Sequence, residues 1–247
     1  GMGLITLNRH EALNALSLNM VIELSHLLNK WKADATVQAV AIRGSTKKGP
    51  FGHFCAGGDI RFFHSAAVSG DTRLDEFFTA EYRLNHLIFT YPKPYIAFLD
   101  GVVMGGGMGI SQGASLRIVT ERTKMAMPET NIGFFPDVGG GFFLSRCPGN
   151  LGEYLGLTGQ LLTGSDALYA GLADYVCQSE KLDQFWTTLS DSTIPVVDER
   201  IAHLKSQIEN QSPSKSQPQW WDHRINDVFA MSSVKEMTIR LKNMSED

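Results

Sequence analysis

Hydrophobic and polar positions follow two different periods along the first 180 residues. Short hydrophobic runs of the kind that form buried β-strands lie at 4–7, 39–44, 95–100, 116–120, 124–127 and 173–176. Between these runs, hydrophobic residues recur at the spacing of amphipathic helices at 20–31 and 75–91, with short helices at 151–157 and 165–170. Strands that alternate with helices in this way predict an α/β fold.

The pattern changes after residue 178. Polar helices are predicted at 182–190, 198–209 and 233–244, and a Ser/Pro/Gln-rich linker interrupts them at 211–218. Trp220 and Trp221 follow this linker and are apolar enough to dock on the body of the protein or on another subunit. We therefore divide the chain into a core of residues 2–178 and a helical C-terminal region of residues 179–247. Because the first strand begins almost at the first residue, we expect a preceding strand to be missing.

Composition excludes some classes of partner. The chain has 247 residues, 43% of them hydrophobic, and a net charge of −4 without a basic run, which argues against a nucleic-acid partner. No apolar segment approaches the roughly 20 residues that span a bilayer, so we expect no membrane partner. The three cysteines are odd in number and far apart, which favours a reducing compartment. We expect a cytoplasmic location, with the mitochondrial matrix as the alternative.

Two glycine-rich turns are candidate binding elements. Residues 104–109 contain three consecutive glycines between a strand and an expected helix start, so main-chain N–H groups there are unobstructed. Such a turn binds a phosphate or a developing oxyanion, or else it only packs a helix tightly against a strand. In the second turn, 55–60, we expect Asp59 to cap a helix and Cys55 to be a small buried hydrophobic residue.

Carboxylates in apolar surroundings are the candidates for acid–base chemistry. The loop 128–141 places Glu129 and Asp137 among prolines, glycines and apolar residues, where desolvation raises the pKa of a carboxyl group. The eight residues between them fix no distance. Glu81 lies among the aromatic residues of the helix at 75–91, where it faces either solvent or a cleft.

Four motifs in register resemble the enoyl-CoA hydratase/isomerase (crotonase) superfamily over residues 4–177. These motifs are Leu13-Asn-Ala-Leu16, Phe54-Cys-Ala-Gly-Gly-Asp-Ile60, Gly101 through Gly107, and Pro128-Glu129. Residues 57–61, 127–130 and 135–141 are most similar to its 3-hydroxyisobutyryl-CoA hydrolase branch, which acts in valine breakdown. The resemblance implies a crotonase-like spiral of repeated ββα units with a helical C-terminal region that builds a homo-oligomer, a trimer. That region would be truncated here.

The resemblance also implies roles for individual residues. The N–H groups of Gly58 and Gly106 would form an oxyanion hole for a thioester oxygen. Coenzyme A would be bound as part of the substrate, without a further cofactor or a metal. Its contacts would fall near Ala15, Leu16, Ala56, Asp59 and Ile60.

One position departs from the hydratase pattern. Family hydratases carry a second glutamate where this chain has Gly109, whereas Asp137 and Glu81 match the hydrolase branch. Asp137 is therefore expected to be catalytic, with a structural cap of a helix at 139–146 as the alternative, and Glu81 is expected to bind the substrate.

The resemblance therefore implies an acyl-CoA thioester hydrolase in which Glu129 acts as nucleophile or as general base. The alternatives are an enoyl-CoA isomerase or hydratase and a non-catalytic acyl-CoA-binding fragment.

Overall fold

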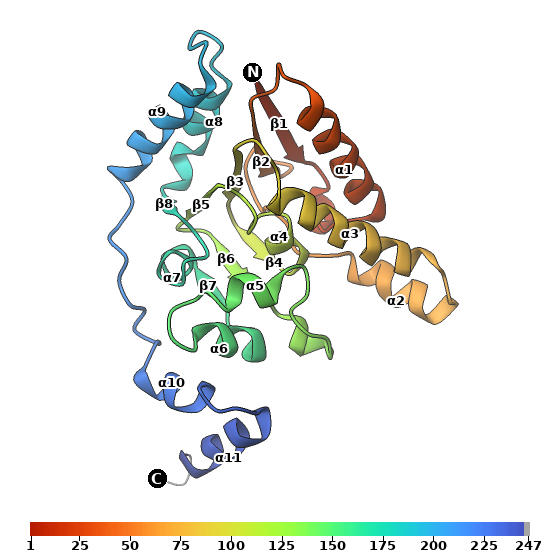
Figure 1. The fold of residues 1–247 in the computed structure, drawn as a ribbon, viewed down its shortest axis with the longest axis vertical. Coiled ribbons are helices and arrows are strands. Elements are labelled where there is room, and N and C mark those ends of the chain that lie inside the picture. The colour runs from red at the N-terminus through yellow and green to blue at the C-terminus, as the bar shows by residue number, and fades with distance from the viewer. Residues whose placement is uncertain (245–247) are drawn as a thin grey trace.

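The computed structural model describes residues 1–244 and contains two β-sheets (Figure 1). The larger sheet has five parallel strands in the order β1-β2-β3-β5-β8. Its strands are β1 (Met2–Leu7), β2 (Ala39–Gly44), β3 (Tyr95–Leu99), β5 (Leu116–Thr120) and β8 (Tyr175–Cys177). In the smaller sheet, the central strand β6 pairs in parallel with β4 and antiparallel with β7. These strands are β4 (Val102–Met104), β6 (Lys124–Ala126) and β7 (Leu162–Thr163).

Helices cover the sheets and extend beyond them at the C-terminal end, where α10 and α11 lie farthest from β1 (Figure 1). The α-helices are α1 (Leu18–Ala33), α2 (Ile60–Ser69), α3 (Arg73–Phe89), α4 (Gly106–Gly109), α5 (Gly140–Leu144), α6 (Leu151–Thr158), α7 (Gly164–Tyr169), α8 (Leu182–Ser190), α9 (Val197–Glu209), α10 (His223–Phe229) and α11 (Val234–Met244). The 3₁₀-helices are η1 (His10–Ala12), η2 (Glu129–Ile132) and η3 (Ser179–Lys181). Among residues 1–244, no helix combines the length and the apolar character needed to cross a membrane.

Both faces of the larger sheet are buried. Val40 and Ile42 of β2 belong to the core that α1 and α3 share, whereas Ala41 between them belongs to a second core with α8 and α9. Successive side chains of a strand point to opposite faces, so the two helical layers lie on opposite sides of the sheet. This arrangement explains why β2 and β3 are hydrophobic without interruption, as strands buried on both faces are.

A recurring unit links the two sheets. After β3 the chain turns at Gly101 into β4 and then into α4, and after β5 it turns into β6 and then into η2. Earlier in the chain, β2 leads to Cys55, which forms a parallel bridge with Val103, and then to α2 and α3. This repetition is the expected spiral of ββα units, and it brings three chain segments together at the smaller sheet.

The predicted strands and most predicted helices are confirmed, and Ser17 caps α1, since its hydroxyl accepts from the Met20 N–H. The helix expected at 75–91 begins and ends two residues earlier. The expected order of strand, glycine turn and helix start is present, but the strand that enters the turn is β4, and the helix α4 lies within the glycines and ends at Gly109. The short elements β7 and α10 were not predicted, since two strand residues and seven helical residues give too little periodicity.

The tryptophan pair docks on the body of the protein. Trp221 is buried in the main core, and Trp220 stacks on Tyr154 with ring centroids 5.9 Å apart. The indole N–H of Trp220 also donates to Asp166 at 3.3 Å. The expectation that this apolar pair docks is therefore confirmed for the body of the same chain.

Candidate active site

The loop at 13–16 is hydrogen-bonded to the turn at 55–60. The Leu16 N–H donates to the Gly57 carbonyl at 2.7 Å, and the Leu16 carbonyl accepts from the Asp59 N–H at 3.0 Å. The Ala56 N–H donates to the Leu13 carbonyl at 3.1 Å. The residues expected to contact coenzyme A thus come together, although the N–H groups of Leu16, Ala56 and Asp59 are already engaged within the protein.

Asp59 has the structural role expected of it. Its side chain accepts from the Phe62 N–H at the start of α2 and from the Arg9 guanidinium at 2.6 Å. Burial alone would raise the pKa of Asp59, but the hydrogen bond and charge of Arg9 and the backbone hydrogen bond from Phe62 lower it below the ordinary value. Arg9 has no local sequence signal for this contact, because its partner is 50 residues away.

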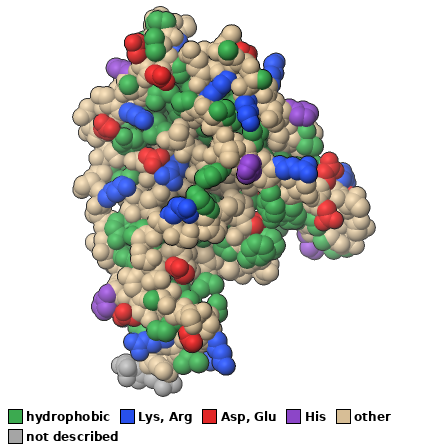
Figure 2. Space-filling view, viewed as in Figure 1, with side chains coloured by type: hydrophobic (Ala, Val, Ile, Leu, Met, Phe, Trp, Pro, Cys, Tyr) green, Lys and Arg blue, Asp and Glu red, His purple; other side chains and the backbone are tan. Residues whose placement is uncertain are grey.

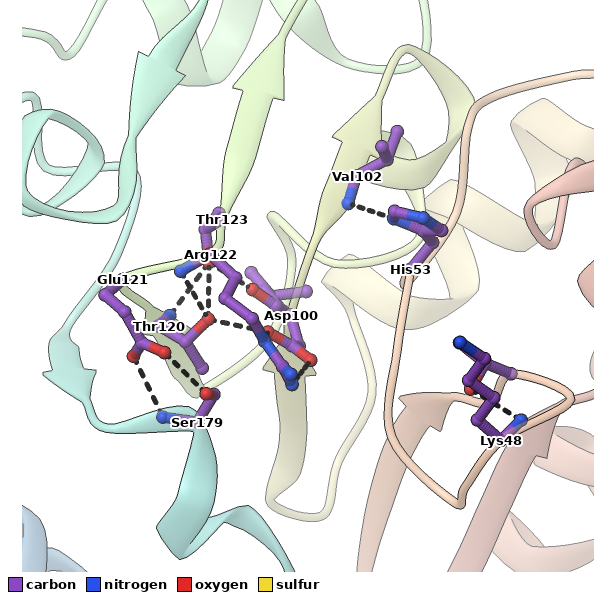
Figure 3. A network of polar contacts seen from close by, with 11 residues as sticks. Lys48, His53, Asp100, Val102, Thr120, Glu121, Arg122, Thr123 and Ser179 are labelled. Atoms are coloured by element: carbon purple, nitrogen blue, oxygen red, sulfur yellow. Dashed lines mark hydrogen bonds and ion pairs between the residues drawn. The ribbon is translucent and has the colours of Figure 1, made fainter.

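Polar contacts flank the turn from β3 into β4, which precedes the glycine turn (Figure 3). Asp100, at the end of β3, is 1% exposed and accepts hydrogen bonds from the Thr120 hydroxyl at 2.6 Å and from Arg122 Nε at 3.0 Å. The Val102 N–H, at the start of β4, donates to His53 Nδ1 at 3.2 Å. These bonds fix both ends of the turn from β3 into β4. They thereby fix the position of the glycines that directly follow β4.

Gly58 and Gly106 present free N–H groups to one cavity. The cavity has a volume of about 370 Å³, and both glycines line it. Within residues 1–244, neither N–H donates a hydrogen bond to the protein. The two positions are adjacent, since a Cβ on Gly106 would lie 3.4 Å from the Gly58 nitrogen. It would also overlap Glu81 Oε1, so a side chain at position 106 would displace the Glu81 carboxyl group.

Three carboxyl groups line the same cavity: Glu81 from α3, Glu129 from η2, and Asp137 from the loop before α5. Glu81 is 2% and Glu129 is 8% exposed. Glu81 Oε1 and Glu129 Oε2 are buried without a hydrogen-bond partner among the described residues. Asp137 Oδ2 accepts from the Tyr82 hydroxyl at 2.7 Å. The convergence that the sequence left open is therefore present.

Burial makes all three carboxyl groups weaker acids than usual. It raises the pKa of Glu81 to about 8, and the charges of Asp137 and Glu129 add to this effect. Burial also raises the pKa of Glu129 to about 7, with a further contribution from Asp137. The pKa of Asp137 is raised by burial as well, and the hydrogen bond from Tyr82 opposes that rise. Such values suit carboxyl groups that exchange protons near neutral pH.

The structure decides between the alternative roles expected for Asp137 and Glu81 and shows the setting of Cys55. The Asp137 side chain binds Tyr82 rather than a helix N–H, and α5 begins at Gly140 after Gly139, so Asp137 does not cap that helix. Glu81 faces the cavity and not solvent. Cys55 is 0% exposed, and burial raises the pKa of its thiol to about 12, as expected of a small buried residue.

Tyr82 is a site residue that the sequence pattern did not single out. Its only signal in the sequence is that of one aromatic residue among several in the helix. Its hydrogen-bond partner lies 55 residues further along the chain. Within residues 1–244, no group of three or more His, Cys, Asp or Glu side chains could hold a metal ion.

Two free N–H donors beside carboxyl groups can stabilise an oxyanion while a carboxylate attacks or activates water.

Comparisons with known proteins agree with this architecture. The family model described as enoyl-CoA hydratase/isomerase matches residues 2–247. The chain is 43% identical to the mitochondrial 3-hydroxyisobutyryl-CoA hydrolase of Danio rerio over 97% of this chain and 63% of that protein. It is 42% identical to the small ribosomal subunit protein mS47 of Neurospora crassa over 84% of this chain and 41% of that protein.

A solved structure, a carnitinyl-CoA dehydratase from Mycobacterium thermoresistibile, is 38% identical with a TM-score of 0.83, covering 98% of this chain and 68% of that one. The chain spans 63% of the length of the Danio rerio relative. The family model and this solved structure each match nearly all of this chain. The chain therefore belongs to the enoyl-CoA hydratase/isomerase family.

Proposed function

We propose that this protein hydrolyses the thioester of 3-hydroxyisobutyryl-CoA, or of a similar short 3-hydroxyacyl-CoA, a step of valine breakdown. The observation that carries the proposal is the pair of free N–H groups, at Gly58 and Gly106, in a cavity that also holds Glu129, Asp137 and Glu81. The name of the Danio rerio relative supports the same reaction.

The thioester carbonyl oxygen would lie between the two N–H groups, which stabilise the negative charge that develops on it. Glu129 then either attacks the carbonyl carbon, giving a mixed anhydride that water opens, or takes a proton from water that attacks directly. In both routes the thiol of coenzyme A leaves. A single turnover in ¹⁸O-labelled water distinguishes them, because only an anhydride opened at its Glu129 carbonyl puts label into the protein.

Asp137 and Glu81 would bind the 3-hydroxyl group and adjust the acidity of Glu129. The rim of the cavity carries exposed apolar side chains, among them Ile60 and Ile132, and hydrophobic side chains gather where the arm formed by α2 and α3 meets the body (Figure 2). Such a rim suits the pantetheine part of coenzyme A. Since the N–H groups of Leu16, Ala56 and Asp59 are engaged, contacts there would use carbonyl groups or van der Waals surfaces.

Hydration and isomerisation of enoyl-CoA are the nearest alternative reactions. The resemblance places the second glutamate of hydratases at Gly109, where an added Cβ would lie 2.6 Å from Val138 Cβ and 3.0 Å from Asn85 Oδ1. The packing there leaves no room for a side chain. An isomerase needs only one carboxylate, so Glu129 would suffice for it.

Thiol release tests the proposal. We expect release of free coenzyme A from 3-hydroxyisobutyryl-CoA and no hydration of crotonyl-CoA by the same sample. An isomerase would release no thiol, and hydration of crotonyl-CoA without thiol release would show that a single glutamate suffices for hydration here.

A non-catalytic role is the second candidate, and the 42% identity to a ribosomal protein is the observation that favours it. In that case the chain would bind coenzyme A tightly, as calorimetry would show, without releasing thiol from any thioester.

We further propose a homotrimer, which light scattering would test. The Danio rerio name supports the mitochondrial matrix over the cytoplasm, which cell fractionation would test.

A further inference from the structure

Helix α3 packs against the glycine turn and the residues after it through a series of close contacts. A Cβ on Gly106 would meet Glu81, one on Gly109 would meet Asn85, and one on Gly113 would lie 2.8 Å from the Phe89 Cα atom. Residues four apart on a helix share a face. Asn85 therefore points in the same direction as Glu81, one helical turn further along the same face.

The side chain of Asn85 has no hydrogen-bond partner among residues 1–244. Both Oδ1 and Nδ2 are buried, and neither makes a hydrogen bond within the part of the chain that the structure describes. A buried amide without partners destabilises the folded state, and nearly all such groups in native proteins are satisfied. An apolar residue of similar size would fill the position at lower cost, so a group from outside the chain, a water or a ligand, has to satisfy the amide.

Asn85 borders a second cavity of about 510 Å³. This cavity shares Asp137 and Val138 with the catalytic cavity, and most of its remaining wall is apolar, with Phe89 and Phe142 among its residues. The polar side chains that line this cavity with Asn85 are His86, Gln112, whose amide is bonded to Leu172 and Arg117, and the pair formed by the Asp137 carboxyl and the Tyr82 hydroxyl.

The chemistry of the amide restricts the ligand. Its Nδ2 donates and its Oδ1 accepts, so a group that satisfies both must itself accept and donate. An anion would face the carboxyl group of Asp137, and an ammonium group would leave Nδ2 unpaired. A hydroxyl group is neutral and does both.

We propose that the Asn85 amide, together with Asp137 and Glu81, binds the hydroxyl group of the acyl chain and thereby selects hydroxylated over unsubstituted acyl-CoA thioesters. The inference deepens the proposed thioester hydrolysis and rests on it. Gly109 lies against the amide, because a Cβ at position 109 would come within 3.0 Å of Oδ1 and 3.1 Å of Nδ2. A site built to bind a hydroxyl group rejects the analogue that lacks it, since the polar group of the protein is then left unpaired.

The test compares 3-hydroxyisobutyryl-CoA with isobutyryl-CoA, which has the same carbon skeleton without the hydroxyl group. We expect Asn85→Leu to lower the preference for the hydroxylated thioester, the ratio of the two kcat/KM values, by about 10-fold to 100-fold. Turnover of isobutyryl-CoA should not fall. Asn85→Ser, which keeps a donor and an acceptor, should retain part of the preference. The matched control is Thr79→Leu, an exposed residue of the same helix that lines neither cavity, and it should keep the wild-type ratio.

An unchanged ratio in Asn85→Leu would overturn the inference, and so would an equal fall for both substrates, which indicates a structural role. Calorimetric binding of the two thioesters to wild type and to Asn85→Leu separates this inference from the proposed reaction. If the wild type releases no thiol, the proposed reaction fails. A hydroxyl-dependent affinity that disappears in Asn85→Leu would still support the binding role, and equal affinities in the wild type would refute it.

Discussion

Replacing Gly106 by alanine places one methyl group between the two N–H groups of the proposed oxyanion hole. The added carbon would overlap Glu81 Oε1 and would lie 3.3 Å from Leu16 Cδ1 and 3.4 Å from the Gly58 nitrogen. The last two distances are tight contacts. Glu81 lines the cavity, so its carboxyl group would have to move into it. The methyl group would therefore cover the donors without removing either N–H.

Loss of one oxyanion-hole donor typically lowers kcat by ~10²–10³, equivalent to about 2.7–4 kcal/mol of transition-state stabilisation. We expect Gly106→Ala to lower kcat for thioester hydrolysis by this amount, because the substrate oxygen can no longer approach both N–H groups. The displaced Glu81 should also destabilise the fold by about 1–3 kcal/mol, the usual cost of overpacking a core. Urea denaturation measures that second effect separately.

The assay follows thiol release from 3-hydroxyisobutyryl-CoA with a thiol reagent. Its background is low because Cys55, Cys147 and Cys177 are all buried. Gly141→Ala is the matched control. Gly141 lies in α5, and a Cβ there would meet no atom within 4 Å. It should keep wild-type kcat and stability. A folded Gly106→Ala protein with wild-type kcat would refute the oxyanion hole as placed here.

Four further outcomes are expected. Glu129→Gln and Asp137→Asn should each nearly abolish thiol release while calorimetry still detects coenzyme A binding; turnover by either variant would remove that residue from catalysis. Because the pKa of Glu129 is raised to about 7 and its ionised form is needed, kcat should increase as the pH rises through 7. The raised pKa of Glu81 means that the folded state holds a proton that the unfolded state has lost, so stability should fall as the pH rises from about 4.5 to about 8. Glu81→Gln should therefore be more stable than wild type at pH 8, on the order of 2–4 kcal/mol by chemical denaturation, and less pH-dependent over this range. Asp100→Asn should cost about 2 kcal/mol, because it weakens the buried hydrogen bonds from Thr120 and Arg122; an unchanged denaturation midpoint would contradict this.

Local patterns were sufficient for much of the fold. Uninterrupted hydrophobic runs identified β2 and β3, and helical spacing identified α1 and α8. The elements that escaped prediction are those whose form depends on neighbours. β4 has three residues and exists because β6 pairs with it, and β7 has two residues and pairs with β6 as well.

The candidate site divides in the same way. The sequence by itself determined the two glycine turns, the Asp59 cap and the apolar setting of Glu129 and Asp137, because backbone freedom, capping and desolvation are properties of short stretches. Only the tertiary structure decided that Glu81 joins those carboxyl groups, that Tyr82 binds Asp137, and that Asn85 is left without a partner beside Gly109. These relations depend on how closely α3 packs against the turn at Gly106, a contact between segments distant in the chain that no local pattern encodes.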